Sequence, residues 1–437
     1  MAFQYITFTT AAQQLAGRLQ DPNLVYWNQP NELLECLYEA VRFNQALTGS
    51  YKQKLNFNTA ARKNYYSLSD PSVVPNTPLQ NFVTDVEVAN NILAALLEPP
   101  LTTGWTGTGQ FTFAQLQAAM QARLNRFIGD TGRQVTQQNI GGPSPPIDLV
   151  SLPDGVLDVR RAAWMPLPGV QIYPLGRMDE WAEQTYIPAA TQQPTQPIAY
   201  SVYGVPPQTL RCIPPPLSNG EIDLLIVQSG VTLNLNPASP VVIGISDDLT
   251  PAVKWGALAD LLGSDGPSRD YARAAYCEQR YREFVEVARI YASVLTGSIN
   301  NVTCGIGSVF DLDFYQPDWQ QTSGPPTFVG IAGRHLACVG QTPDGVYGIS
   351  LWTCANAPVS GYMQIGRDQI DPVLDYAQHI ASFKMGGAEF DGTDRLYQNL
   401  ITSAKAQNGR LEAIAFYKCQ AELPATKGDM EMARMIA

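Results

Sequence analysis

Residues 247–290 read DDLTPAVKWGALADLLGSDGPSRDYARAAYCEQRYREFVEVARI, and this stretch decides the predicted fold. Thr250 is a favourable N-cap and Pro251 suits the first helical position, so a helix is expected to begin there. Gly263 and Gly266 interrupt the pattern, and a longer helix follows, with apolar residues spaced by three and four. Its expected buried face consists of Ala274, Cys277, Tyr281, Phe284 and Ala288. The stretch predicts a pair of packed helices, and nothing in it is typical of a catalytic site.

A second stretch, residues 368–409, repeats this plan when it is shifted by 121 residues. It reads DQIDPVLDYAQHIASFKMGGAEFDGTDRLYQNLITSAKAQNG. We expect Asp371 to cap the helix, Pro372 to open it, and Gly386 and Gly387 to separate it from the next one. The structural residues of the two helix pairs are therefore Thr250, Pro251, Trp255, Asp371, Pro372 and Tyr376.

Two earlier segments also resemble each other. FTTAAQQLAGRL at 8–19 and FTFAQLQAAMQARL at 111–124 both place a threonine before a glutamine-rich amphipathic helix that ends in Arg-Leu. Thr9 or Thr10 is the expected N-cap of the first helix. Another helix is expected from Asn31 to Gly49. The chain thus has two opening helices and two closing helix pairs.

Strand patterns lie between the openings and the closings. Short apolar segments separated by Pro, Gly and Asn-Gly turns are typical of antiparallel strands. The clearest in the first region are VLDVRRAAW (156–164), IAYSVYG (198–204), TLRCIPP (209–215) and EIDLLIVQ (221–228). A further region spans 302–352, and KLNFNTAARKNYYSLSD predicts two short strands around a turn. The predicted class is α+β, combining helical bundle elements with antiparallel β-sandwich or barrel-like regions.

The order opening, opening, closing, closing predicts nested domains. An inner domain at 101–296 would interrupt an outer domain made of 1–100 and 297–437. The Pro- and Gly-rich segment 99–110 would join them. Two or three consecutive domains with accidental helix similarity remain the alternative.

Charge is sparse and acidic along the whole chain. Only 15% of residues are charged, against about 25% in typical soluble domains, and the net charge is −11. No basic run is present, so general DNA binding is disfavoured. Many neutral residues and 20 tyrosines suit large protein–protein interfaces, where charged residues are depleted.

The sequence predicts neither a membrane span nor a leader, because it lacks a long apolar run and a basic start. The seven cysteines are scattered without any Cys-x-x-Cys pair, so a zinc site is not expected and reduced thiols are favoured. Disulfide pairing among Cys304, Cys338 and Cys354 is the alternative.

Catalytic residues are few. His335 and His379 are the only histidines, and structural roles are expected because no Gly-x-Ser-x-Gly motif accompanies them. Asp311, Asp313 and Asp318 alternate in FDLDFYQPDW and would suit paired carboxylates or calcium, but exposed loop aspartates are the simpler interpretation. No cofactor is expected, and the protein is predicted not to be an enzyme.

These features together resemble a known family. The segment 112–296, with FTFAQLQAAMQARL, VLDVRRAAW, LRCIPPP and the closing pair from 247, is similar to head-to-tail adaptor proteins of tailed bacteriophages. The opening FTTAAQQLAGRLQDPNLVYWNQPNELLECLYEAVRFNQAL also resembles an adaptor start, with a helix, an aromatic loop and a longer helix. This chain differs from the simple family pattern in its length and its doubled plan.

The resemblance implies a structural virion protein of the phage neck, assembled in the host cytoplasm. Such adaptors form rings, usually of twelve copies, that bind the portal protein and a tail or nozzle protein. Genomic DNA passes through the central channel without sequence-specific binding, and a negative wall would not retain it. A tail nozzle or tail-tube ring is the first alternative. A glycan hydrolase using Asp311 or Asp313 and a carbohydrate-binding module are further ones.

The segment 424–437 is expected to be a flexible C-terminal tail. It contains Met430, Met432 and Met435, whose side chains adapt to irregular grooves, so docking on the portal or a neighbouring copy is one hypothesis. A frayed end without a partner is the alternative.

Overall fold

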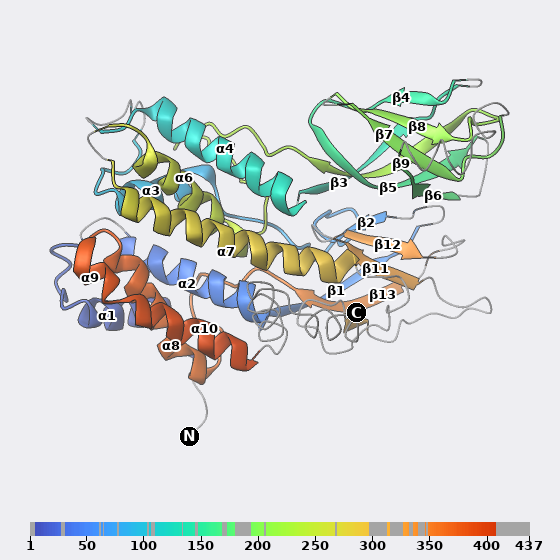
Figure 1. Cartoon of the computed structure of the whole chain (residues 1–437). Coiled ribbons are helices and arrows are strands. Elements are labelled where there is room, and N and C mark those ends of the chain that lie inside the picture. The colour runs from blue at the N-terminus through green and yellow to red at the C-terminus, as the bar shows by residue number, and fades with distance from the viewer. Residues whose placement is uncertain are drawn as a thin grey trace, which may run out of the picture. The chain divides into compact units, whose positions relative to one another are not determined.

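Helices and strands occupy separate blocks of the chain, which places it in the α+β class, as predicted (Figure 1). The computed structural model describes most of residues 5–407. The described residues are 5–27, 31–60, 63, 65–76, 78–102, 105, 110–132, 134–144, 147–167, 173–179, 194–204, 207–266, 269–296, 313–314, 327–331, 335–339, 346 and 348–407.

The chain divides into two units. The first consists of residues 1–51, 93–100 and 356–437, and the second consists of residues 52–92 and 101–355. The predicted domains share with these units the boundary after residue 100. They differ because residues 52–92 and 297–355, predicted in the outer domain, belong here to the second unit. Strands from these two segments pair with each other, so both segments join the same unit.

The regular secondary structure described in the first unit is helical. Their order is α1 (Phe8–Arg18), α2 (Glu32–Thr48), α8 (Arg367–Ser382), α9 (Gly387–Asp391) and α10 (Asp394–Gln407). Helix α2 packs against α1, α8 and α10, and α8 also packs against α1 and α10. Rings fill the space between them: the Tyr376 centroid lies 5.2 Å from Phe43 and 5.7 Å from Tyr397. The residues that form this unit's core therefore come from both ends of the chain.

In the second unit, three long helices pack together: α4 (Phe113–Thr131), α6 (Pro251–Gly263) and α7 (Tyr271–Thr296). Figure 1 shows them alongside one another. The predicted face of α7 is buried, with Cys277, Phe284 and Ala288 at 0% exposure. Helix α3 (Asp85–Ala95) crosses the border between the units and ends before Pro99.

The largest sheet lies in the second unit and has seven strands in the order β3-β9-β5-β6-β7-β8-β4. Every pairing is antiparallel except β6–β7, which is parallel, so the prediction of antiparallel pairing fails at that one pair. The strands are β3 (Val135–Gly141), β4 (Leu149–Ser151), β5 (Val156–Pro166), β6 (Tyr173–Arg177), β7 (Ala199–Tyr203), β8 (Thr209–Ile213) and β9 (Gly220–Gln228). One face buries a core that includes Trp164, Tyr200 and Leu224. The four quoted strand segments are confirmed as β5, β7, β8 and β9.

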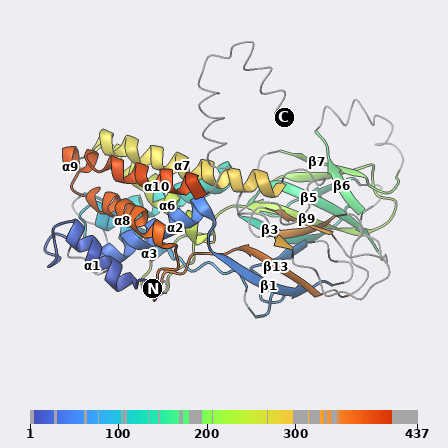
Figure 2. The same cartoon turned by 90° about the horizontal axis from the view of Figure 1, so that it is seen from below.

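Two further sheets have three strands each. One has the order β1-β13-β10 and the other β11-β12-β2. Their strands are β1 (Lys52–Asn58), β2 (Tyr65–Ser67), β10 (Asp313–Phe314), β11 (Thr327–Ile331), β12 (His335–Val339) and β13 (Gly348–Cys354). Figure 2 shows β1 beside β13, with Leu55 opposite Leu351. The strands β1 and β2 follow each other in sequence but pair with distant partners.

The two opening helices, α1 and α4, have the same kind of N-cap, and each contains an arginine that binds carboxylates of the closing helices. Thr7 caps α1 and Thr112 caps α4, each accepting a hydrogen bond from the backbone three residues on. The expected N-cap at Thr9 or Thr10 is wrong, because α1 already begins at Phe8. Near the end of α1, Arg18 donates to Asp375 at 2.5 Å and to Asp371 at 2.7 Å.

Arg123 in α4 also donates hydrogen bonds to two carboxylates, and its side chain is more deeply buried than that of Arg18. Its Nε lies 2.7 Å from Asp260 Oδ2, its Nη1 lies 2.6 Å from Glu278 Oε2, and its Nη2 also donates to Asp260. Burial alone lowers the pKa of Arg123, but the bonds and charges of the two carboxylates outweigh it and raise that pKa. In each unit, an arginine of the opening helix thus fixes a closing helix through carboxylates.

Candidate functional site

The residues predicted for the first helix pair have structural roles. Thr250 precedes α6, and its hydroxyl donates to the Asp247 carbonyl at 2.7 Å instead of capping the helix. Pro251 takes the first helical position, as predicted. Trp255 is 1% exposed, and Tyr276 lies edge-on to it at 5.7 Å between centroids. These residues fill a core and offer no group to a ligand.

The second helix pair differs from the prediction at its start. Helix α8 begins at Arg367 with Gly366 as N-cap, so Asp371 and Pro372 lie inside the helix, and the predicted cap at Asp371 is wrong. The Gln369 side chain accepts a hydrogen bond from the Gly366 N–H at 3.1 Å, which stabilises the earlier start. Pro372 is accommodated near the N-terminal end, where the loss of its N–H removes a single helical bond. Tyr376 is fully buried.

Among the candidate catalytic residues, His379 is the one whose side chain belongs to the described part of the chain. His379 is 1% exposed, its Nδ1 lies 2.8 Å from the Thr393 hydroxyl, and its ring stacks on Phe390 at 4.7 Å. It is a packed structural histidine. Strand β12 contains His335 and strand β10 contains Asp313, and both side chains lie outside the described part of the chain. Asp311 and Asp318 lie outside the described residues.

Metal and membrane signals are equally sparse. Within the described ranges, no three histidine, cysteine, aspartate or glutamate side chains lie close enough together to hold a metal ion. No described helix combines the length and apolarity that a bilayer crossing requires. Cys212 and Cys277 are free thiols. Burial raises the pKa of Cys212 to about 12, so this thiol is not a nucleophile at neutral pH.

The segment of residues 21–27, which follows α1, is the strongest candidate site in the first unit. The Asp21 carboxylate accepts hydrogen bonds from the backbone N–H groups of Val25 and Tyr26, both at 2.8 Å, and of Trp27 at 3.2 Å. The Val25 N–H is the largest influence lowering the pKa of Asp21, and the other two N–H groups and Lys384 reinforce it against the effect of burial. The carboxylate is therefore charged at neutral pH and holds the loop in one shape.

Two groups at and just after the C-terminal end of α8 also fix this segment. Trp27 is 4% exposed, and its Nε1 donates to the Ala381 carbonyl at 3.1 Å. The Lys384 ammonium donates to the Tyr26 carbonyl at 3.0 Å and to Glu32 at 2.7 Å. It also lies 4.5 Å from the Tyr26 ring centroid. The loop conformation is thus set before any partner binds.

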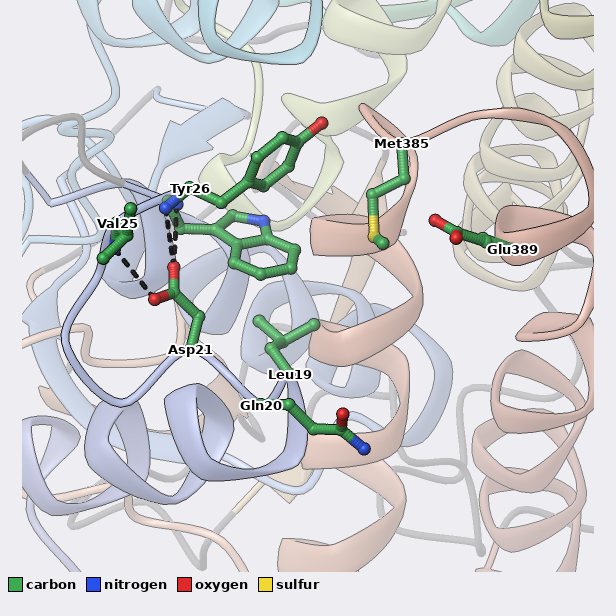
Figure 3. A pocket seen from close by; sticks show the side chains of 8 residues that line it. Leu19, Gln20, Asp21, Val25, Tyr26, Met385 and Glu389 are labelled. Carbon is green, nitrogen blue, oxygen red and sulfur yellow. Dashed lines mark hydrogen bonds between the residues drawn. The ribbon is translucent and has the colours of Figure 1, made fainter.

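The loop exposes apolar side chains beside a hollow. Leu24, Val25 and Tyr26 are 44%, 74% and 43% exposed, and Met385 across the hollow is 40% exposed. The hollow has a volume of about 400 Å³. Its lining consists of Leu19, Gln20, Asp21, Val25, Tyr26, Trp27, Met385 and Glu389. Figure 3 shows Asp21 and Tyr26 on one side and Met385 and Glu389 on the other.

This arrangement suits docking better than chemistry. Of the two carboxylates in the lining, that of Asp21 is already occupied by three backbone N–H groups and is not available as a base, and no histidine, cysteine, serine or lysine stands beside Glu389 among the described lining residues. Consecutive exposed apolar residues on a pre-formed loop are instead typical of a protein-binding surface, since little ordering entropy is lost on binding. The sequence marked this segment only as an aromatic loop, and its hydrogen-bond network was not predictable. Met430, Met432 and Met435, the predicted partner-binding residues, lie outside the described residues.

Comparisons with family models and with curated proteins provide no functional assignment for this chain. No protein-family model matches the chain, and no curated protein matches it in sequence.

Proposed function

We propose that this protein is a structural virion subunit that forms a ring in the neck of a tailed bacteriophage. The ring, of about twelve copies, joins the portal protein to a tail or nozzle protein and lets DNA pass through its channel. The subunit is assembled in the host cytoplasm, has no catalytic role and uses no cofactor. The resemblance of its opening and closing segments to head-to-tail adaptors motivates this proposal.

The observation that supports it best is the pre-formed loop with exposed Leu24, Val25 and Tyr26. A subunit of a permanent assembly needs rigid apolar surfaces of this kind, because each interface must bury apolar area without a large ordering cost. Arginine anchors fix the closing helices in both units, which also suits a protein whose task is mechanical connection.

Charge is consistent with a passage for DNA. The net charge of −11 and the scarcity of basic runs give phosphates no strong attraction, so DNA would slide past such a wall. A protein that grips DNA would instead show a basic stripe on one face.

Mass photometry of the purified chain, alone and mixed with the portal protein of its phage, tests the proposal. We expect a closed species of about twelve times 47.7 kDa, at least in the presence of the portal. A chain that stays monomeric under both conditions would contradict the ring. A ring that forms but binds a tail protein and not the portal in a pull-down would favour the nozzle or tail-tube alternative.

A further inference from the structure

The hollow beside residues 21–27, which we call the docking loop, is lined by aromatic, thioether and carboxylate groups. One wall presents the Tyr26 ring and the other presents the Met385 thioether, so a flexible apolar chain can contact both (Figure 3). The exposed Glu389 points its carboxylate into the same space (Figure 3). The Asp21 carboxylate is occupied by backbone N–H groups, so Glu389 is the acid that faces an incoming group. The hollow therefore suits a cation flanked by soft apolar side chains.

The chain itself contains such a sequence. Residues 432–435 read Met-Ala-Arg-Met, which puts Arg434 between two methionines. We propose that the hollow binds this segment of a second copy of the chain, with Arg434 beside Glu389 and the methionines against Tyr26 and Met385. This inference rests on the proposed ring, and it names one of the contacts that would close it.

Chain length permits the contact. Gln407, where the described chain stops, hydrogen bonds to Asp368 at 3.3 Å, at the start of α8. The hollow lies at the other end of α8, about 24 Å away for a helix of this length. The residues from 407 to 432 span up to about 80 Å when extended, enough to leave their own subunit.

Ring symmetry favours binding of the segment to the hollow of a second copy over binding to the hollow of its own chain. A ring of identical subunits closes through contacts in which one surface of each copy meets a different surface of the next. A hollow on one copy and a distant segment on another supply such a pair. Binding within one chain would use the same residues without linking subunits, and it is the outcome that the experiment must separate.

Charge reversal in the full-length protein provides that separation. Glu389→Arg puts a cation in the hollow, and Arg434→Glu puts an anion on the segment. Each single variant would place like charges together, and we expect its ring association to be about tenfold weaker. Mixing the two variants in equal amounts restores opposite charges at every contact of an alternating ring. The association of the mixture should return to within about threefold of wild type.

Asp391→Arg is the matched control, because it makes the same charge change on the same short helix outside the lining of the hollow. It should retain wild-type association. Sedimentation velocity with and without portal protein measures all of these. A double variant that recovers while the mixture does not would show binding within one chain and overturn the inference. Single variants that match wild type, or a control as weak as Glu389→Arg, would overturn it and leave the ring intact. A wild-type chain that never forms a ring would instead contradict the proposed function.

Discussion

Arg123 shows why single residues in this protein must be judged by their surroundings. Its side chain is 8% exposed, and its guanidinium contacts Asp260 and Glu278 and lies 5.0 Å from the Tyr281 ring centroid. The planar fork of arginine fits two carboxylates at once, which lysine cannot do. Arg282, with 72% exposure, makes a single contact of 3.4 Å to Glu278. The two arginines share a partner, but only the buried one organises the helix junction.

A buried carboxylate makes stability depend on pH. Asp223 in β9 is 3% exposed, and burial raises its pKa from 3.8 to about 6, although the Gln137 hydrogen bond and the Lys63 charge act in the opposite direction. The folded state therefore holds this proton more tightly than the unfolded state. The free energy of unfolding should fall by roughly 3 kcal/mol in total as pH rises from well below 4 to well above 6, with about 2 kcal/mol of this loss between pH 4 and pH 6.

Asp223→Asn should remove that slope and make the protein more stable than wild type at pH 7, because no charge is then buried. Its amide oxygen still accepts from Gln137. Urea unfolding at several pH values measures the effect. Asp154→Asn removes an exposed carboxylate from the same unit and serves as the control. Parallel pH profiles for wild type and Asp223→Asn would contradict the prediction.

Helix interiors show a related dependence on context. Glycine in a helix usually costs about 1 kcal/mol relative to alanine, so replacing it should stabilise the protein. At Gly256 in α6, however, an added Cβ would lie 2.8 Å from Arg123 Cδ and 3.0 Å from Tyr281 Cδ2. The ion pairs of Arg123 prevent its stem from moving away. At Gly129 in α4, nothing lies within 4 Å of the added atom.

We therefore expect the two alanine substitutions to act in opposite directions. Gly256→Ala should destabilise the protein by about 1–3 kcal/mol through overpacking. Gly129→Ala should stabilise it by about 0.5–1 kcal/mol. Urea midpoints measure both, and each variant is the control for the other. Equal gains at both positions would show that Arg123 is free to move.

Most of the long helices could be predicted from the sequence, whereas the strand partners could not. Apolar spacing located α2, α4 and α7, because a buried helix face repeats at a fixed period, and Pro251 marked the start of α6. Strand partners were not predictable, since β1 pairs with β13 across nearly the whole chain. The alignment of Pro372 with Pro251 also misled, because a proline near a helix start does not fix where the helix begins.

At the scale of the whole molecule, the docking loop could not be predicted either, because its contacts join residues that are distant in the sequence. Asp21 and Trp27 are neighbours in sequence, but the loop is completed by Lys384 and Ala381 from the far end of the chain. Sequence showed an aromatic loop, and only the fold showed that its apolar residues remain exposed. The proposed function comes from the resemblance in sequence, whereas the exposed loop surface was found in the structure. The resemblance and the surface are therefore independent of each other.

A substitution on the loop surface should separate assembly from folding. The Val25 backbone N–H is held by Asp21, while its side chain is 74% exposed. Val25→Asn therefore leaves the loop intact and makes its tip polar. We expect ring association to weaken by about tenfold, because a polar group would be buried without a matched partner. The urea midpoint should remain within about 0.5 kcal/mol of wild type, as for most surface changes.

Val346→Asn is the matched control, because Val346 is 72% exposed and belongs to the other unit. Mass photometry across a dilution series, with and without portal protein, gives the association of wild type and both variants. Weakening by Val25→Asn alone would tie assembly to the docking loop. Equal weakening by both variants would mean that general surface polarity controls association, and unchanged association for Val25→Asn would remove the loop from the ring interface.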